Sequence, residues 1–535
     1  MEEEKLLVPE PVPSIPLEEE KKSKSSLKIE AKFLNPEKEF NKLFKDLNLD
    51  EEEKKGSSQT DVAGVHLSKK AKQRLEKYKQ AKGAHKRHTI SKTLFPKSDL
   101  PRNAIPRTIT MRPIDPDESN HTVFTYDESE EYAIVQKRFL DAQRSNNIGQ
   151  LYEFLQTHHY HSECLLIISE FSRLKGSFSE STKLLERCLT VFETTWNFAF
   201  SPLKDPPNTR LDFKNSRLCQ IFGEALFRYI DVLGRRGCTR TALEYCKLVL
   251  SFCPENDPYG ILLIIDFYGI RAGEYKAIQE FILSHFVQEF YKPKEKYQSL
   301  LLLPNMLYSY ALAGKMLRSS STPTETQLSE ELAKVFSLKT INEMVTLGEN
   351  ATLMLAIILY PSLLKHIINK LKGPSNISWN TLLSKIEKLT KGKKYYANYT
   401  WICKEYNAEL VKRSLKKIYC IYDEKGGTCF APDNVQVWLR TVANFLLDGA
   451  LSNEFDLNLI KSQIIEKTMC PFYLERYSNL NVIDYKDDLA TIPQEELNPI
   501  IENTLFAPAS APSPNLQEPG TQPNLLVAFF RSLFD

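Results

Sequence analysis

The most distinctive chemical feature of the sequence is segment 66–92, which contains ten Lys and Arg residues and a single acid, Glu76. On a helix these cations would surround the whole circumference, because Leu75 and Tyr78 are too few to form a core-facing stripe. This charge density is typical of a segment that binds phosphates in a salt-dependent way, with little dependence on base sequence. We therefore predict contact with RNA through its shape and phosphates, with a nuclear-import signal as the alternative. The predicted RNA-binding residues are Lys69, Lys70, Lys72, Arg74, Lys77, Lys79, Lys82, Lys86 and Arg87.

The last twelve residues form a second candidate binding element. On a helix, their large apolar side chains would share one face, and a proline-rich stretch precedes them. Such a helix suits docking into a groove, either on this protein or on a partner. The predicted partner-binding residues are Leu526, Phe529, Phe530, Arg531 and Leu533.

Metal-dependent chemistry has one candidate cluster. His158, His159, His161 and Cys164 are close enough in sequence to share an ion, but soluble helix starts often carry His and no second ligand cluster is evident. We therefore favour a structural role for them and predict no metal site.

Other catalytic patterns are weak. The sequence contains no phosphate-binding loop, no GxSxG nucleophile elbow and no HExxH motif. Cys238 and Cys246 flank a predicted helix start, where a thiolate would be stabilised, but Cys246 falls where a small buried side chain is needed. Acids such as Glu130 and Glu131 are explained by their favourable position in a first helical turn. We therefore predict a protein that is not an enzyme, with no catalytic residues and no cofactor.

The composition indicates a globular helical protein. Of 535 residues, 42% are hydrophobic and 26% charged, which excludes a wholly disordered chain, and only 19 are Gly. The start lacks the pattern of a secretory signal, and no apolar stretch approaches the ~20 residues that span a bilayer. The ten scattered cysteines, without any CxxC, indicate reduced thiols. We expect a cytoplasmic protein without membrane association, with the nucleus as a further location.

Changes in charge and proline content divide the chain into six parts. The predicted fold is all-α, an irregular helical repeat of the tetratricopeptide type (an α-solenoid), with a disordered N-terminal region and a Pro-rich C-terminal tail. The parts are a disordered acidic leader with one short helix near Glu37–Leu49 (1–65), the basic segment (66–95), a proline-rich strap (96–122), the repeat region (123–372), a C-terminal helical module (373–485), and a proline-rich tail with a terminal apolar helix (486–535).

Helix pairs with matching spacing support the repeat interpretation. In the first pair Ser169 lies on one helix, Gly176 marks the turn and Ser181 lies on the next helix, and in the second pair Ala242 and Cys246 would occupy the seam. Tetratricopeptide-type repeats need small side chains where two helices approach closely. A third, looser pair is expected around residues 257–281, and an irregular helical bundle is the alternative.

The stretch Arg236–Leu250, followed by Pro254 and Asp257-Pro258, resembles the ribosome quality control complex subunit 1 family, whose animal member is called transcription factor 25. Further similar stretches lie at Phe124–Phe139, Tyr160–Leu166, Pro96–Met111 and Phe529–Leu533. The strap usually carries Trp-Pro where this chain has Leu100-Pro101, and the N-terminal lysine tract of the family is usually denser than here.

This resemblance implies a non-enzymatic subunit of the complex that clears stalled nascent chains from large ribosomal subunits. The implied partners are the ribosomal RNA of that subunit, a Listerin-type ubiquitin ligase, ubiquitin, the valosin-containing-protein ATPase and the nascent-chain-binding quality control subunit. The implied role is to promote polyubiquitin chains that signal degradation and to recruit the ATPase for extraction. A nuclear regulator that uses the basic segment to bind nucleic acid is the alternative.

Overall fold

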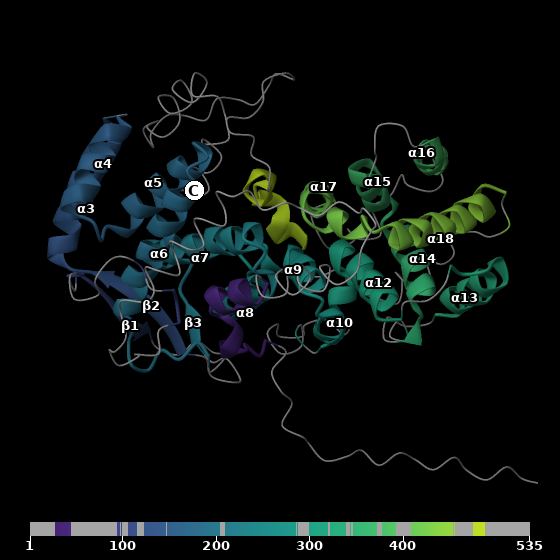
Figure 1. The fold of residues 1–535 in the computed structure, drawn as a ribbon, viewed down its shortest axis with the longest axis horizontal. Helices are drawn as coiled ribbons and strands as arrows, with labels where there is room; N and C mark the ends of the chain where they lie inside the picture. The colour runs from purple at the N-terminus through teal and green to yellow at the C-terminus, as the bar shows by residue number, and fades with distance from the viewer. Residues whose placement is uncertain are drawn as a thin grey trace, which may run out of the picture.

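The computed structural model is an elongated array of helices with a small β-sheet near one end (Figure 1). It describes residues 27–43, 94–96, 98, 105–106, 108–114, 122–145, 147–203, 209–284, 286, 299–318, 322–338, 343, 346–371, 377–391, 408–452, 454 and 474–486. The predicted all-α repeat class is confirmed, because helices build nearly all of this part of the chain.

The helices follow one another along the array. The α-helices are α3 (Glu130–Arg144), α4 (Ile148–Thr157), α5 (Ser162–Leu174), α6 (Phe178–Thr194), α7 (Arg217–Arg235), α8 (Thr239–Phe252), α9 (Ile265–Arg271), α10 (Tyr275–Ile282), α12 (Pro304–Arg318), α13 (Glu325–Ser337), α14 (Glu349–Leu359), α15 (Pro361–Leu371), α16 (Ile377–Lys391), α17 (Ala408–Glu424) and α18 (Asp433–Leu451). Short 3₁₀ helices are η1 (Ala31–Phe33), η3 (Ile261–Leu263), η4 (Leu300–Leu302), η7 (Gly426–Phe430), η8 (Leu474–Asn479) and η9 (Val482–Tyr485).

Three turns connect helices in the same way, and each uses a glycine in the left-handed region. Gly176, Gly237 and Gly273 have φ values of 76°, 76° and 73° and connect α5 to α6, α7 to α8 and α9 to α10. After each glycine the next residue's N–H donates to a carbonyl five residues earlier, the Schellman arrangement that ends a helix. These bonds are Ser177 to Ser172 at 2.8 Å, Cys238 to Leu233 at 3.0 Å and Glu274 to Gly269 at 2.9 Å. The third helix pair is thereby confirmed.

The predicted seams lie where the helices approach closely. Ser169 and Ser181 are buried, and the Ser169 hydroxyl donates to the Ser181 carbonyl oxygen at 2.9 Å. Ala242 and Cys246 are fully buried in the α7–α8 pair. Small side chains at these positions let the helix axes approach, as the repeat interpretation requires.

A three-stranded sheet is added to the helices. Strands β1 (Ile109–Ile114), β2 (Thr122–Glu128) and β3 (Thr209–Leu211) lie in that order, with β1 antiparallel and β3 parallel to β2. Pro113 opposes Phe124 within β1, which is an edge strand and therefore tolerates a residue without an N–H.

The predicted repeat region (123–372) does not begin with helix, because residues 123–128 belong to strand β2. Their alternating Val-Phe-Thr-Tyr pattern places Phe124 and Tyr126 in aromatic contacts with Phe200 and Phe192, at ring-centroid distances of 5.1 and 5.0 Å. Helix α3 starts at Glu130 after Ser129, whose side chain caps it.

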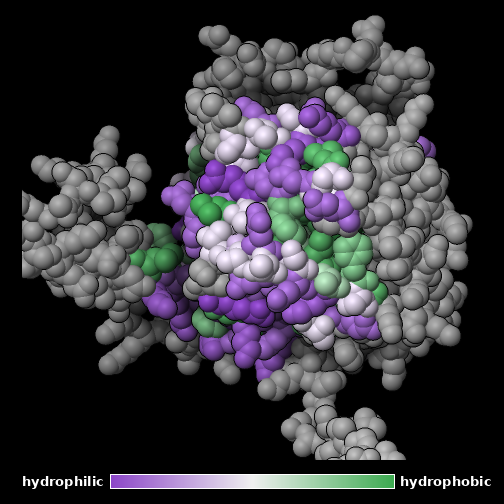
Figure 2. Space-filling view, turned by 90° about the vertical axis from the view of Figure 1, so that its right-hand side faces the viewer, coloured by the Kyte–Doolittle hydropathy of each residue, from purple (hydrophilic) through white to green (hydrophobic). Residues whose placement is uncertain are grey.

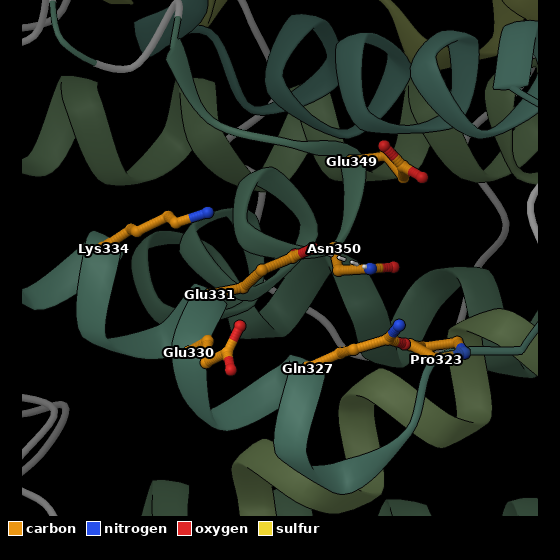
Figure 3. Close-up of a pocket in the computed structure, with 7 residues that line it drawn as sticks. All are labelled: Pro323, Gln327, Glu330, Glu331, Lys334, Glu349 and Asn350. Carbon is orange, nitrogen blue, oxygen red and sulfur yellow. Dashed lines mark hydrogen bonds between the residues drawn. The ribbon is translucent and has the colours of Figure 1, made fainter.

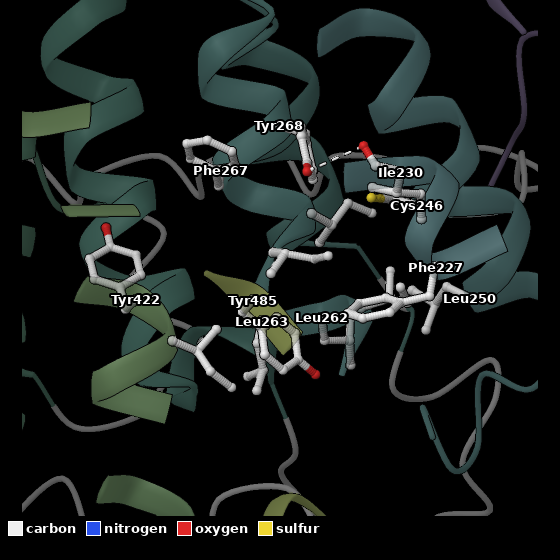
Figure 4. Close-up of a cluster of buried hydrophobic side chains, with 14 of the residues drawn as sticks. Phe227, Ile230, Cys246, Leu250, Leu262, Leu263, Phe267, Tyr268, Tyr422 and Tyr485 are labelled. Carbon is white, nitrogen blue, oxygen red and sulfur yellow. Dashed lines mark hydrogen bonds between the residues drawn. The ribbon is translucent and has the colours of Figure 1, made fainter. Parts of the chain in front are cut away.

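The C-terminal helices share the core of the repeats. Figure 4 shows Tyr422 of α17 and Tyr485 of η9 in one buried cluster with Phe227, Phe267 and Tyr268 of the repeat helices. The predicted C-terminal module (373–485) therefore packs directly against the repeat region.

The far end of the array, on the right in Figure 1, contains α13, α14 and α18. Among the described residues on this face, polar side chains predominate and hydrophobic side chains lie between them (Figure 2). The terminal helices of the array therefore expose some apolar surface among their polar groups.

No single helix among the described residues is both long and apolar enough to cross a membrane. Helices α14 and α15 have such a composition only together, and they are bent by 106° at the break between them.

Candidate functional site

The α7–α8 helix pair is the place where two distant segments of the chain are held. Residues 27–43, here called the N-terminal docking segment, lie against α8, and residues 474–486, here called the C-terminal return segment, lie between the repeat helices and α17 (Figure 1). Helix α8 and the turns around it contain the stretch that carries the family resemblance, so this pair is the candidate functional site.

The N-terminal docking segment caps α8. The N-cap residue of this helix, Cys238, makes no side-chain cap hydrogen bond. The Glu39 carboxylate replaces it by accepting from the backbone N–H groups of Arg240 at 2.9 Å and Thr241 at 2.7 Å. A carboxylate at this position satisfies two unpaired donors and meets the positive end of the helix dipole.

Ion pairs fasten the same segment along α8. The Arg240 guanidinium donates to Glu30 at 2.8 Å and to Glu244 at 2.6 Å, and it covers the Phe33 ring at 4.3 Å. In return the Glu244 carboxylate accepts from the Glu30 backbone N–H at 2.7 Å. Hydrogen bonding from Lys32 and the nearby Arg240 charge lower the pKa of Glu30, against the opposing effect of burial. Residues 36–43 are helical, which confirms the predicted short helix for the described part of Glu37–Leu49.

A second anchor lies at the C-terminal end of the basic segment. The Glu193 carboxylate of α6 accepts from the backbone N–H groups of Leu94 and Phe95. The Phe95 ring is 2% exposed and packs edge-on against Trp196 and Phe222 at 5.7 and 6.0 Å. The chain is therefore held by α6–α8 both before and after residues 44–93.

The C-terminal return segment forms buried polar contacts with the repeats. Asp484 accepts from Arg228 of α7 at 2.8 Å, and Arg228 also pairs with Glu224 at 2.8 Å. Burial raises the pKa of Glu224 to about 7, although Arg228 opposes the shift. The Tyr477 hydroxyl donates to Asp257 at 3.1 Å and the Tyr485 hydroxyl donates to the Tyr259 carbonyl at 2.8 Å.

Asp257, which follows the stretch that resembles the family, has a structural role. Its φ is 42°, and its carboxylate accepts from the N–H groups of Ile261 at 2.7 Å and Leu262 at 3.0 Å. It thus starts η3 and holds Tyr477 at the same time, which ties the end of the helix pair to the C-terminal return segment.

Two sets of predicted site residues lie outside the described residues. They are the RNA-binding set, Lys69, Lys70, Lys72, Arg74, Lys77, Lys79, Lys82, Lys86 and Arg87, and the partner-binding set, Leu526, Phe529, Phe530, Arg531 and Leu533. Both sets stay predictions.

The histidine cluster has a structural role in the geometry. His161 is fully buried and caps α5: its Nδ1 accepts from the Cys164 backbone N–H at 3.2 Å, and its Nε2 lies 2.8 Å from the Gln136 side-chain oxygen. Tyr132 stacks on the ring at 5.2 Å. Burial lowers the pKa of His161 to about 3, so the ring is neutral. No group of His, Cys, Asp and Glu suited to a metal ion occurs within the described ranges.

The thiols near the start of α8 are neutral. Burial raises the pKa of Cys238 to about 11 and raises that of Cys246 as well. A buried thiol of raised pKa is a poor nucleophile, so the alternative of a thiolate at this helix start is not supported.

A cavity of about 230 Å³ lies between α13 and α14 (Figure 3). One of the acids that line it, Glu331, caps α14 by accepting from the Ala351 N–H at 2.9 Å, and it also accepts from the Asn350 side chain at 3.2 Å. The Asn350 oxygen in turn accepts from Trp438 of α18 at 2.7 Å. These polar groups hold α13, α14 and α18 together.

A family model described as "Transcriptional repressor TCF25" matches residues 124–508. The chain belongs to the TCF25 family. The match includes the α7–α8 pair and the C-terminal return segment, whereas the N-terminal docking segment lies outside it. No solved structure matches the chain.

Several relatives of this TCF25-family chain are named as subunits of a ribosome quality control complex. "Ribosome quality control complex subunit TCF25" of Homo sapiens is 34% identical over 239 residues, 45% of this chain and 33% of the relative. The protein of the same name from Dictyostelium discoideum is 26% identical over 317 residues, 59% and 39% of the two chains. "Ribosome quality control complex subunit 1" of Schizosaccharomyces pombe is 30% identical over 213 residues, 38% and 29%. The chain thus spans less than two fifths of the length of these relatives.

The docking contacts of this TCF25-family member were only partly foreseeable. The short helix before residue 43 was predicted from its apolar spacing, but its partner was not, because Glu39 and Thr241 are about 200 residues apart in sequence. Two features could have suggested the contact: a short helical segment that contains acidic residues, and a distant helix start that lacks a capping side chain.

Proposed function

We propose that this chain is a non-enzymatic subunit of the ribosome quality control complex and binds stalled large ribosomal subunits through their RNA. Membership of the TCF25 family, with curated members named as subunits of that complex, is the observation that carries the proposal. The proposed partners are the large subunit, a Listerin-type ubiquitin ligase, ubiquitin, the valosin-containing-protein ATPase and the nascent-chain-binding quality control subunit, in the cytoplasm.

The two anchors on α6–α8 support RNA binding by the basic segment. The Leu43 side chain lies over Gly237 in the turn between α7 and α8. The centroid of the Phe95 ring is 6.1 Å from that of the Tyr245 ring of α8. The fifty residues between the anchors therefore start and end on one helix pair. Lys69 and its neighbours are close to the midpoint of this stretch, which can extend at most about 80 Å from the anchors. A cationic stretch of chain that is held at both ends is suited to reach the phosphates of a large particle.

Sedimentation with large ribosomal subunits tests the RNA contact. Replacing Lys69, Lys70, Lys72 and Arg74 by Glu should abolish co-sedimentation at physiological salt, and the wild type should lose it as salt rises. The matched control replaces four exposed cations of the helices, Lys137, Arg138, Lys183 and Lys276, by Glu. An unchanged gradient profile for the first variant, or equal loss for both, would refute the role of the basic segment.

Ubiquitin-chain formation tests the role beside the ligase. Adding the purified chain to a Listerin-type ligase and a stalled large-subunit substrate should shift the products toward the linkage that signals proteasomal degradation. Recovery of the valosin-containing-protein ATPase on the same particles should then depend on the chain. Products of unchanged linkage would leave the chain a scaffold only.

The terminal apolar helix is proposed as a partner-docking element. Replacing Phe529 and Phe530 by Ser should reduce co-purification of the ligase or another complex subunit while the melting temperature stays unchanged. A fall in the melting temperature with intact co-purification would instead indicate docking onto this chain.

A nuclear regulator of transcription is the second candidate, favoured by the description of the matching family model. It would use the basic segment for import or for DNA. Localisation of the tagged full chain decides between the two: an exclusively cytoplasmic protein excludes the regulator, and an exclusively nuclear one excludes the ribosomal role.

A further inference from the structure

Helix α17 carries a second, compact group of cations on the folded part of the molecule. Lys412, Arg413, Lys416 and Lys417 form two i,i+4 pairs on adjacent rows of one helix, so they share one face, here called the α17 basic face. Lys412, Arg413 and Lys416 are exposed and Lys417 is partly buried. The opposite side of the helix is fixed in the core by Leu415, Ile418 and Tyr422, among others.

These cations lack the counter-ions that neighbouring cations have. Lys365 pairs with Glu387 at 3.5 Å, Lys370 with Glu424 at 3.4 Å and Lys385 with Asp448 at 2.7 Å. Within the part of the chain that the structure describes, no carboxylate forms an ion pair with any member of the α17 basic face. Four adjacent positive charges without neutralisation repel one another and favour binding of an anion.

The lowered pKa of Lys417 is consistent with mutual repulsion among these cations. Burial lowers its pKa first, and the charge of Arg413 lowers it further. The surrounding sequence is also strongly basic: residues 361–425 contain fourteen Lys and Arg against five acids, although the whole chain carries a formal charge of only +2.

We propose that the α17 basic face is a second RNA-binding surface, which docks on the phosphate backbone of double-stranded RNA. The proposal rests on the ribosomal function proposed above and adds a contact made by the folded array itself. A rigid helix with regularly spaced point charges suits a duplex with regularly spaced phosphates.

The make-up of the face favours RNA over a membrane. Surface helices that bind bilayers combine their cations with large apolar side chains that enter the acyl region. The positions beside these cations on α17 that are at least partly exposed are Glu409, Leu410 and Cys420, so the only large apolar side chain there, Leu410, is itself partly buried. An RNA backbone needs only the cations.

Two contacts on one particle would strengthen each other. The basic segment is anchored on α6–α8, whereas α17 packs against η8 and α15. When one site is bound, the other is held at a high effective concentration near the same RNA, which raises the overall affinity.

The test uses the full chain with Lys69, Lys70, Lys72 and Arg74 already replaced by Glu, so that the basic segment does not mask the second site. In this background, Lys412→Gln, Arg413→Gln and Lys416→Gln should weaken binding to a labelled 20-base-pair RNA duplex about tenfold or more. The slope of log Kobs against log salt should become less negative by about 2 to 3, since each phosphate contact contributes about 0.9.

The matched control replaces Lys365, Lys370 and the partly buried Lys486, which are paired with carboxylates, by Gln. It should bind the duplex like its parent. Equal affinity and slope for the α17 variant and its parent would overturn the proposal. So would loss of binding to phosphatidylserine vesicles with unchanged duplex binding, which would indicate a membrane surface.

The two proposals fail separately. If the chain does not sediment with ribosomal subunits but the α17 variant still loses duplex affinity, the ribosomal role is refuted and the RNA surface stands. If sedimentation depends on Lys69–Arg74 but the α17 variant sediments and binds the duplex like its parent, the ribosomal role stands and the α17 RNA surface is refuted.

Discussion

The α7–α8 pair and helix α17 use charged residues in opposite ways. In the pair, Arg228, Arg240 and Glu244 are largely buried, and each one contacts a residue from a segment far away in sequence. On α17, Lys412, Arg413 and Lys416 are exposed and have no ion-pair partner among the described residues. The charged residues of the α7–α8 pair form contacts within the chain, whereas the α17 cations are available to bind another molecule.

This difference shows how a binding surface can be separated from a structural network. Most residues of the stretch that most resembles the family are buried, and its charged residues Arg240 and Glu244 bind the N-terminal docking segment. Its role in the structure is therefore to hold that segment. Substitutions in the two regions should therefore change different measurements: stability in the first and salt-dependent RNA affinity in the second.

The largest expected loss of stability comes from breaking the buried Arg228 network. Arg228→Ala leaves the buried Glu224 and Asp484 without their common cation, which should reduce the free energy of unfolding by about 3–5 kcal/mol. Urea unfolding measures this effect. The control Arg112→Ala breaks an exposed pair with Asp127 and should change stability by less than about 1 kcal/mol. Equal effects would mean that burial does not distinguish the two pairs.

Overpacking the seam should come next. Ala242 is 0% exposed between α7 and α8, so Ala242→Trp forces the helices apart and should cost about 1–3 kcal/mol. Thermal unfolding measures the change. An unaltered melting temperature would contradict the close approach of the two helices at this point.

Acid should destabilise the protein through His161. The folded-state pKa is about 3, and the unfolded value is about 6.5. Below pH 6.5 the unfolded chain takes up a proton that the folded chain excludes, so stability is fully present above pH 6.5 and is lost as the pH falls toward 3. The loss from pH 6.5 to 5 should be about 2 kcal/mol.

The difference between the wild type and His161→Gln isolates this contribution, because Gln does not titrate. The stability of the variant relative to the wild type should improve as the pH falls. Asp266, with a pKa raised to about 6 mainly by burial, acts in the opposite direction in both proteins and cancels in the difference. A difference that is independent of pH would contradict a neutral buried His161.

Removing the distant cap of α8 should have a smaller effect. Glu39→Ala leaves the N–H groups of Arg240 and Thr241 without their acceptor and should cost about 0.5–2 kcal/mol. Limited proteolysis within residues 27–43 should accelerate, because the N-terminal docking segment is held less firmly. The neighbouring exposed residue provides the control, since Lys38→Ala should cleave like the wild type.

The smallest effect on stability is expected on α17. Lys412→Gln, Arg413→Gln and Lys416→Gln together should change the free energy of unfolding by less than about 0.5 kcal/mol, because these three residues form no ion pair with another described residue. Urea unfolding measures it beside the RNA affinity. A large destabilisation would place these residues in the same class as Arg228.

Sequence reasoning succeeded where the signal is local. The seams at Ser169–Ser181 and Ala242–Cys246, and the turn at Gly176, follow from residue size and spacing within one helix pair, and each lies where it was expected. The sheet was missed because β3 has only three residues and pairs with a strand more than eighty residues earlier.

The candidate site was predicted less well. The Glu39 cap and the Arg228–Asp484 pair join residues more than 200 positions apart, and no periodicity in one sequence reports such pairs. The sequence shows the α17 cations, but RNA binding was predicted for residues 66–92 because the density of cations is higher there. Their shared face and missing counter-ions became clear only in three dimensions.

The capping of α8 by Glu39 also sets an order of events during synthesis. Residues 27–43 leave the translating ribosome about 200 residues before α8 is complete, which at 5–20 residues per second is roughly 10–40 s. Leu27 and Leu34 are buried in the folded molecule. During that interval α8 is not yet available to pack against them. The apolar side chains of residues 27–43 therefore cannot pack against α8 until that helix has been synthesised.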